Sequence, residues 1–245
     1  YHGHSDGLLI KRGSGLATLG LAGSAGVPEA IAQETIVIPY NDVEALEEAF
    51  SRFGPAIACA ILEPVAANMG VVVPDVEFLR RLRVLTHQHG SLLIFDEVVT
   101  GFRLAFGGAQ TLLGITPDLT VLGKIIGGGF PIGAFGGPRR LMRRLAPEGA
   151  VYHAGTFAGH PVSMTAGTAA LQELTRRPPY ERLDALGEQL ADGLERVAKR
   201  AGVPVQVNRL GSMLTVFFSE DPVKRFEEAA RVDAKRFARF ANCLA

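Results

Sequence analysis

The sequence has 245 residues, of which 47% are hydrophobic, and it carries 25 basic and 25 acidic side chains. A chain of this length and hydrophobicity can bury a large core, which favours one large α/β domain over several small ones. Because the formal net charge at pH 7 is zero, no overall field attracts nucleic acid or an anionic membrane, and a small molecule is the expected partner.

The first part of the chain, residues 1–35, is rich in glycine and predicts a loop-rich segment that either links elements or closes as a lid over a site. His2 and His4 lack a third ligand at metal spacing, so we predict no metal site there. Apolar residues then recur at helical spacing over residues 43–53, and Asn41 is the predicted N-cap of that helix.

Short apolar runs predict strands buried on both faces of a parallel sheet, at residues 57–62, 92–95 and 119–122. A helix predicted at residues 75–89 joins the first two strands, so a right-handed parallel crossover is expected. A fourth strand is predicted at residues 132–135. This order predicts an α/β fold with a mainly parallel sheet covered by helices.

The pattern changes after the sheet to two long helices, residues 161–177 and 180–201, followed by two short strands and a charged helical segment. The break at Pro178 predicts a domain boundary. We expect residues 1–178 to form a large domain and residues 179–245 to begin a smaller α+β domain.

Three predicted strands end in polar groups. Glu63 follows the first, Asp96 the second, and Gly123 with Lys124 the third. Because ligands in open α/β sheets bind outside the carboxyl ends of the strands, Asp96 and Lys124 are expected to converge at that edge. The alternative is an aspartate that caps a turn and a lysine that reaches solvent.

Common nucleotide and hydrolase motifs are absent from the sequence. The lysine lacks the preceding glycine of a P-loop, no G-x-G-x-x-G follows a strand, and there is no G-x-S-x-G elbow. What remains is a lysine amine in a partly desolvated site, able to attack a carbonyl, and an aspartate able to face a pyridinium nitrogen. Together, Lys124 and Asp96 suggest pyridoxal phosphate.

Longer strings around these residues carry a resemblance: FDEVVTGFR, TPDLTVLGKIIGGGFPIGAFGG and YHAGTFAGHPVSMTAG. They resemble the class III aminotransferase group of fold-type I pyridoxal-phosphate enzymes, and the similarity runs through nearly the whole chain, including YHGHSDG, KRGSGLATLGL, PYND and LEPVAANMG. Several strings resemble the aminomutase branch of this family. The ω-aminotransferases carry glutamine and serine where this chain has Val99 and Gly123.

By this resemblance, Lys124 would bond covalently to the cofactor and carry a proton between cofactor and substrate. Asp96 would pair with the pyridine nitrogen. Val98 would pack on one face of the ring, while Tyr1, with His2 beside it, would lie on the other face. The resemblance therefore implies a pyridoxal-phosphate site on the large domain.

The same resemblance implies further contacts. Asn68 would lie near the 3-hydroxyl of the cofactor. Gly155 and Thr156 would bind its phosphate from the neighbouring subunit, so that a homodimer shares the site. Ser14 falls in a stretch that matches a mobile gating loop, residues 5–32, and would contact the substrate carboxylate.

The activity implied is that of an aminomutase, an isomerase that converts glutamate 1-semialdehyde to 5-aminolevulinate, a tetrapyrrole precursor. It would use pyridoxal phosphate, its pyridoxamine form and a diaminovalerate intermediate. One alternative is a class III ω-aminotransferase that uses a 2-oxo acid as acceptor. Another is a non-catalytic dimerising domain of the same fold, against which the retained Lys124 and Asp96 argue.

The chain contains two cysteines, far apart in sequence, and no apolar run of the about 18 to 20 residues that would cross a bilayer. We therefore expect reduced thiols in a soluble, cytoplasmic protein.

The sequence starts at Tyr1, and by the resemblance another phosphate-binding loop would precede it and the rest of the small domain would follow residue 245. His160 stands where the family usually has asparagine.

Overall fold

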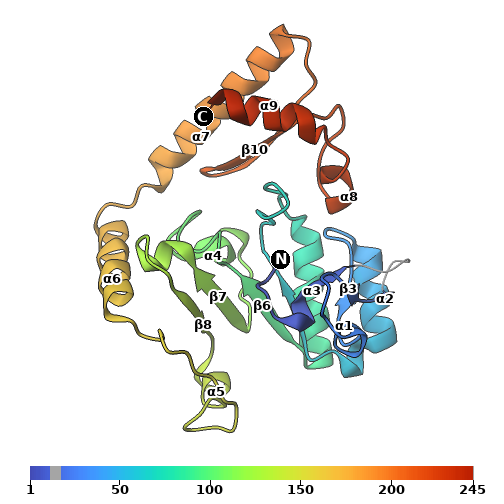
Figure 1. Cartoon of the computed structure of the whole chain (residues 1–245), viewed down its shortest axis with the longest axis vertical. Helices are drawn as coiled ribbons and strands as arrows, with labels where there is room; N and C mark the ends of the chain where they lie inside the picture. Colours follow the sequence, from blue (N-terminus) through green and yellow to red (C-terminus); the bar gives the residue numbers. More distant parts are fainter. Residues whose placement is uncertain (12–17, 245) are drawn as a thin grey trace.

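The computed structural model describes residues 1–11 and 18–244. Its centre is a sheet in the order β5-β6-β7-β8 (Figure 1). The strands are β5 (Cys59–Leu62), β6 (Leu92–Asp96), β7 (Leu119–Gly123) and β8 (Gly133–Gly136). The first three run parallel and β8 is antiparallel to β7, so the prediction of an α/β fold with a mainly parallel sheet is confirmed.

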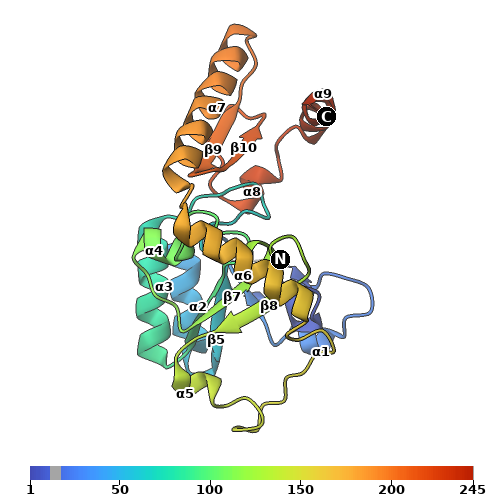
Figure 2. The ribbon, with the colours of Figure 1, turned by 90° about the vertical axis from the view of Figure 1, so that its left-hand side faces the viewer.

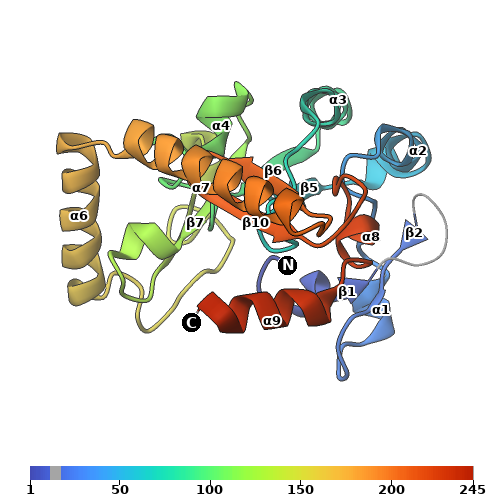
Figure 3. The ribbon, with the colours of Figure 1, turned by 90° about the horizontal axis from the view of Figure 1, so that it is seen from above.

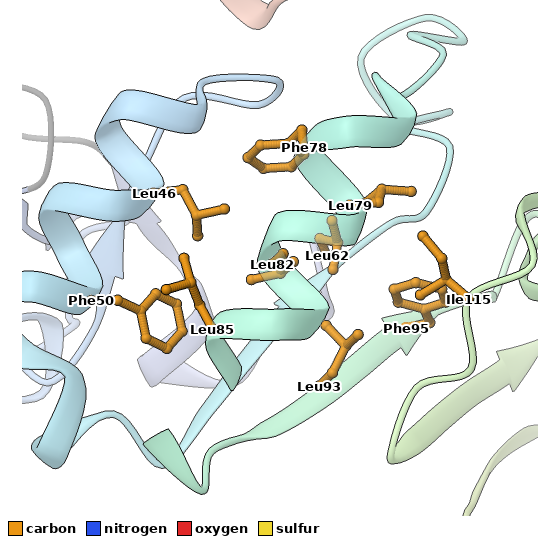
Figure 4. Close-up of a cluster of buried hydrophobic side chains, with 10 residues drawn as sticks. All are labelled: Leu46, Phe50, Leu62, Phe78, Leu79, Leu82, Leu85, Leu93, Phe95 and Ile115. Carbon is orange, nitrogen blue, oxygen red and sulfur yellow. The ribbon is translucent and has the colours of Figure 1, made fainter. Parts of the chain in front are cut away.

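Helices cover one face of this sheet. Figure 3 shows α2 (Val43–Phe53), α3 (Val76–His89) and α4 (Gly108–Leu113) along that face, with α1 (Glu29–Ala32) on the other side. The main hydrophobic core lies under α3, and Figure 4 shows its side chains meeting between α2, α3 and the sheet. This core consists of Leu46, Phe50, Leu62, Phe78, Leu79, Leu82, Leu85, Leu93, Phe95 and Ile115.

The start of α2 differs from the prediction. Asp42, not Asn41, is the N-cap, because its Oδ1 accepts a hydrogen bond of 3.0 Å from Ala45 N. Asn41 has a positive φ of 62°, and its side chain bridges distant segments, donating to the carbonyl of Lys224 and accepting from Asp75 N. An asparagine tolerates this left-handed conformation and can hydrogen-bond locally, which is why it precedes the cap here.

The remaining segments lie along one side of the sheet and beyond one end of it (Figures 1 and 2). Figure 2 shows α6 along the outside of the sheet and α7, β9 and β10 beyond it. These elements are α5 (Arg139–Met142), α6 (Pro161–Arg176), α7 (Tyr180–Arg200), β9 (Gln206–Leu210), β10 (Met213–Phe217), α8 (Phe226–Ala229) and α9 (Ala234–Leu244). The shorter pieces are β1 (Ile10–Lys11), β2 (Thr18–Leu19), β3 (Leu21–Ala22), β4 (Ile36–Val37), and the 3-10 turns η1 (Asp6–Leu8), η2 (Gly54–Ala56) and η3 (Lys124–Gly127).

The hairpin of β9 and β10 packs on loops that follow two strands of the sheet. Met213 shares one buried cluster with Val65 and Leu104, and Phe217 shares another with Ala66. The end of the hairpin is thus held at the carboxyl edge of the sheet. The division at residue 178 stays a prediction.

The structure also bears on the cysteines, on membrane-spanning helices and on metal-binding clusters. Cys59 and Cys243 are free and exposed in the structure. Among the residues that the structure describes, no helix combines the length and hydropathy that a membrane crossing requires. Within the same ranges, no three His, Cys, Asp or Glu side chains gather as metal ligands would.

Candidate functional site

Asp96 lies at the carboxyl end of β6 and is almost buried, with 8% of its surface exposed. Its Oδ2 lies 2.7 Å from His2 Nδ1, and its Oδ1 accepts a hydrogen bond of 3.0 Å from Val98 N. Burial by itself raises the pKa of Asp96, but the hydrogen bonds from His2 and Val98 and the charges of His2 and Lys124 outweigh it. The net effect lowers the pKa, so the carboxylate is ionised at neutral pH.

Lys124 lies at the carboxyl end of β7, the strand beside β6, and opens the turn η3. The structure brings it to the same edge as Asp96, close enough for its charge to lower the pKa of that carboxyl group. Its backbone is strained, with a φ of 48° that residues other than glycine rarely adopt.

Lys124 is exposed in the structure, and the partial desolvation of its amine stays a prediction. A group that binds against this amine would desolvate it further.

The turn η3, which carries Lys124, packs against α6. A Cβ at Gly128 would lie 2.5 Å from the carbonyl oxygen of Ala166, and a Cβ at Gly167 would lie 2.1 Å from that of Ile126. Glycine at both positions allows the helix backbone and the turn backbone to meet, since any side chain would collide. This close packing stabilises the strained conformation of Lys124.

Val98 follows Asp96 by two residues and is half-buried. It packs against Gly123, where an added Cβ would lie 3.3 Å from Val98 Cγ1. The valine and the glycine thus form a smooth apolar floor between the two strand ends. A side chain at position 123 would push Val98 away.

Asn68 lies in the loop after β5 and is exposed. The carboxylate of Glu63 holds this loop, since its Oε2 accepts hydrogen bonds from Ala67 N at 3.0 Å and Asn68 N at 3.2 Å. Burial is the main cause that raises the pKa of Glu63, and Asp96 contributes in the same direction. Glu63 and Asp96 therefore interact electrostatically at one sheet edge.

Tyr1 is 70% exposed, while the neighbouring His2 reaches Asp96. The aspartate contact of His2 was not foreseen from the sequence, because the two residues are 94 positions apart and no local pattern links them. Among the described residues, no ring contact involves Tyr1. Its role beside a cofactor ring stays a prediction.

Gly155 and Thr156 lie in the exposed segment between α5 and α6. Two residues before Gly155, the ring of His153 packs edge-on against Phe135 of β8, with 5.2 Å between the ring centroids. The role of Gly155 and Thr156 as phosphate ligands stays a prediction. Ser14 lies outside the described residues.

Comparison with known proteins gives a family. A family model described as Aminotransferase class-III matches residues 1–237. The chain is 56% identical over 244 residues to a protein of Sulfurihydrogenibium azorense named glutamate-1-semialdehyde 2,1-aminomutase, and 58% identical over 245 residues to one of Thermomicrobium roseum with the same name. Both matches include the whole of this chain, which spans 57% of the length of either relative.

Solved structures share the fold. An omega-transaminase from Sphaerobacter thermophilus matches with a TM-score of 0.87 at 37% identity, over 94% of this chain and 54% of the other. A glutamate-1-semialdehyde-aminomutase from Pseudomonas aeruginosa PAO1 in complex with PMP matches with a TM-score of 0.79 at 28% identity, over 94% of this chain and 52% of the other.

Proposed function

The chain belongs to the class III aminotransferase family, and from this premise we propose that its protein is a glutamate-1-semialdehyde 2,1-aminomutase that uses pyridoxal phosphate and its pyridoxamine form. The proposal rests on one observation above all: an ionised aspartate and an exposed lysine lie at neighbouring strand ends, with an apolar floor between them. The curated relatives of the same name support the choice of reaction.

The residues of the site fit this cofactor. Asp96 has one donor on each carboxylate oxygen, from His2 and Val98, so each oxygen keeps a lone pair for a further donor such as a pyridinium N–H. Lys124 has an exposed amine that a bound aldehyde can reach. The floor formed by Val98 and Gly123 suits a flat ring.

When bound, pyridoxal phosphate supplies a carbonyl that accepts an amino group and a ring that withdraws electrons from the substrate carbon. Asp96 would hold a proton on the ring nitrogen, which maintains that withdrawal. Lys124 would anchor the cofactor and move a proton to and from the substrate carbon. Val98 and Tyr1 would pack on the two faces of the ring, and Asn68 would lie near the 3-hydroxyl.

Groups outside this edge complete the proposed site. Gly155 and Thr156 bind the phosphate from the second subunit of a homodimer, which is consistent with their exposure here. His2 acts beside Tyr1 through its contact with Asp96, and Ser14 binds the substrate carboxylate. We also propose that residues 179–245 begin a second domain, and that the protein is cytoplasmic, in line with its free thiols.

Two positions favour the aminomutase over a general ω-aminotransferase. Val99 packs against an apolar cluster that contains Val65 and Leu104, an environment that disfavours glutamine. A serine at position 123 would crowd Val98, because even a Cβ there comes to 3.3 Å. The second candidate function is nevertheless an ω-aminotransferase with a 2-oxo acid acceptor, which the structural match to an omega-transaminase favours.

The test uses the full-length protein with pyridoxamine phosphate and glutamate 1-semialdehyde as the sole substrate. We expect 5-aminolevulinate to form over many turnovers without any added amino acceptor. Turnover that starts only when a 2-oxo acid and an amine donor are supplied would contradict the aminomutase and support the second candidate. Absence of both reactions would support a non-catalytic domain.

A further inference from the structure

Glu97 is a buried acid that the proposed reaction does not use. It lies between Asp96 and Val98 in the sequence, and 1% of its surface is exposed. Its backbone N–H continues the sheet ladder to the carbonyl of Val121 at 2.9 Å. Because successive residues of a strand point to opposite faces, the Glu97 side chain lies on the side of α4, away from the proposed cofactor.

The carboxylate of Glu97 is surrounded by hydrogen-bond donors. Thr100 Oγ1 and Ala109 N donate to Oε2 at 2.8 and 2.7 Å, while Gln110 N and Nε2 donate to Oε1 at 3.0 and 3.1 Å. Among the described residues, none of the ion pairs involves Glu97, so these neutral donors are what stabilise its buried oxygens. The residue is a satisfied acceptor rather than a free acid.

These contacts close a loop. Residues 98–107 form a loop after Glu97. The chain then returns at Gly108, Ala109 and Gln110, where the Glu97 carboxylate accepts hydrogen bonds from the backbone. Gly108 has a φ of 73°, and a Cβ there would lie 2.3 Å from Glu97 Oε2. Only glycine allows the returning backbone to approach the carboxylate this closely.

An amide cannot replace this carboxylate. Both Glu97 oxygens accept two hydrogen bonds, whereas glutamine offers one accepting oxygen and places an NH₂ group against two donors. A buried donor left without an acceptor is costly, so a Glu97→Gln chain would open the loop to regain water contacts.

We infer that Glu97 is a positioning residue, which fixes the loop 98–107 and thereby sets Val98 and the Asp96 strand end in the arrangement that binds the cofactor ring. This inference rests on the proposed function. It assigns the two adjacent acids separate tasks on opposite faces of the sheet: Asp96 contacts the cofactor, and Glu97 holds the frame around it.

The experiment compares wild type, Glu97→Gln and Asp118→Asn in the full-length apoprotein. Asp118 is a matched control, because its carboxylate also accepts a backbone N–H, from Leu93, but at the opposite end of the strands. Two readouts are taken: the dissociation constant of pyridoxal phosphate by absorbance titration, and the rate of tryptic cleavage after Arg103, which is exposed in the loop. Thermal unfolding reports stability separately.

Glu97→Gln is expected to raise the dissociation constant at least about tenfold, equivalent to about 1.4 kcal/mol, and to speed cleavage after Arg103 by a similar factor. Asp118→Asn is expected to lower the unfolding temperature and leave both readouts within about twofold of wild type. An unchanged dissociation constant in Glu97→Gln would overturn the inference, whatever happens to cleavage. Equal weakening in both variants would also overturn it, because instability alone would then explain the result.

If Glu97→Gln does not fold, Thr100→Val decides the question. Valine keeps the shape and removes one of the donors to Oε2, so we expect the same two changes at about threefold, and no change in affinity would overturn the inference. Failure of the cofactor assignment, on which the inference rests, is distinguishable, since wild type and Asp118→Asn would then bind no pyridoxal phosphate either. The choice between aminomutase and ω-aminotransferase does not affect this test, because both would bind that cofactor.

Discussion

The two ends of the central strands each hold an aspartate with a lowered pKa, and they differ in what surrounds it. At the amino end, Asp118 Oδ2 accepts from Leu93 N at 2.9 Å and from Arg83 Nη1 at 2.7 Å. Burial by itself raises the pKa of Asp118, but these hydrogen bonds and the charges of Arg83 and Arg140 outweigh it and lower the pKa overall. The side chain is thus tied to structural partners from several elements.

At the carboxyl end, Asp96 has comparable electrostatics and a different setting. Its basic neighbours are His2, from the start of the chain, and the exposed Lys124 on a strained turn. Backbone strain and an exposed amine contribute nothing to stability, whereas the Asp118 cluster does. A lowered pKa therefore does not identify a functional acid, and the neighbouring groups do.

The largest effect is expected at Lys124. Lys124→Ala should lower the rate of 5-aminolevulinate formation by about 10²- to 10⁴-fold, because it removes the group that moves the proton. The unfolding temperature should stay close to that of wild type, since the side chain is exposed. Lys199→Ala, an exposed lysine on α7, is the control and should keep full activity. Comparable rates in both variants would contradict the assigned role.

Asp96→Asn should have the next largest effect, with a loss of about 10²- to 10³-fold in kcat, because a neutral amide cannot hold the proton on the ring nitrogen. Asp118→Asn should leave kcat within about twofold. Steady-state kinetics of both variants measure the contrast. Similar losses in the two would show that the strand ends are not functionally distinct.

Stability should show the reverse order. Asp118→Asn should lower the free energy of unfolding at pH 7 by about 1–2 kcal/mol, since charge-assisted hydrogen bonds are lost at a partly screened site. Because the folded-state pKa of Asp118 is lowered, its stabilisation is complete above the unfolded pKa of about 3.9 and disappears as the pH falls through the folded value.

The difference between wild type and Asp118→Asn should accordingly shrink as the pH is lowered below about 4. Urea unfolding at several pH values measures it. A difference that stays constant down to the most acidic condition would show that Asp118 does not stabilise the fold through its charge.

The smallest effect is expected at His2. His2→Ala removes one donor to Asp96 but leaves Val98 N and the charge of Lys124, so cofactor affinity at pH 7 should fall about three- to tenfold. The pKa of Asp96 should rise, and cofactor binding should then be lost at a higher pH on the acid side than in wild type. Titration of cofactor absorbance against pH measures where binding is lost in each protein. If wild type and His2→Ala lose the cofactor at the same acidic pH, the contact between His2 and Asp96 is contradicted.

The sequence predicted the frame of the molecule better than the contacts of its site. The apolar runs at residues 92–95 and 119–122 place both strands and the groups that follow them, because continuous burial leaves a local signal. The contact of His2 with Asp96 leaves none, since it depends on how the first residues return to the sheet.

Three further points show where local patterns fail. Asn41 and Asp42 are both good caps, and only the contact of Asn41 with Asp75 N decides between them. The exposure of Lys124 could not be read from its apolar neighbours, because strand composition reports burial of the strand and not of the turn after it. The role of Glu97 was missed because its hydrogen-bond donors lie at residues 100–110 and come close to its carboxylate only when the loop is folded.

The covalent bond between Lys124 and the cofactor tests the central claim most directly. The full-length protein is loaded with pyridoxal phosphate, reduced with borohydride, digested and examined by mass spectrometry, with Lys124→Ala treated in parallel. We expect the reduced cofactor on the Lys124 peptide of wild type and on no peptide of the variant. An unlabelled wild type, or equal labelling of the variant at other lysines, would contradict it.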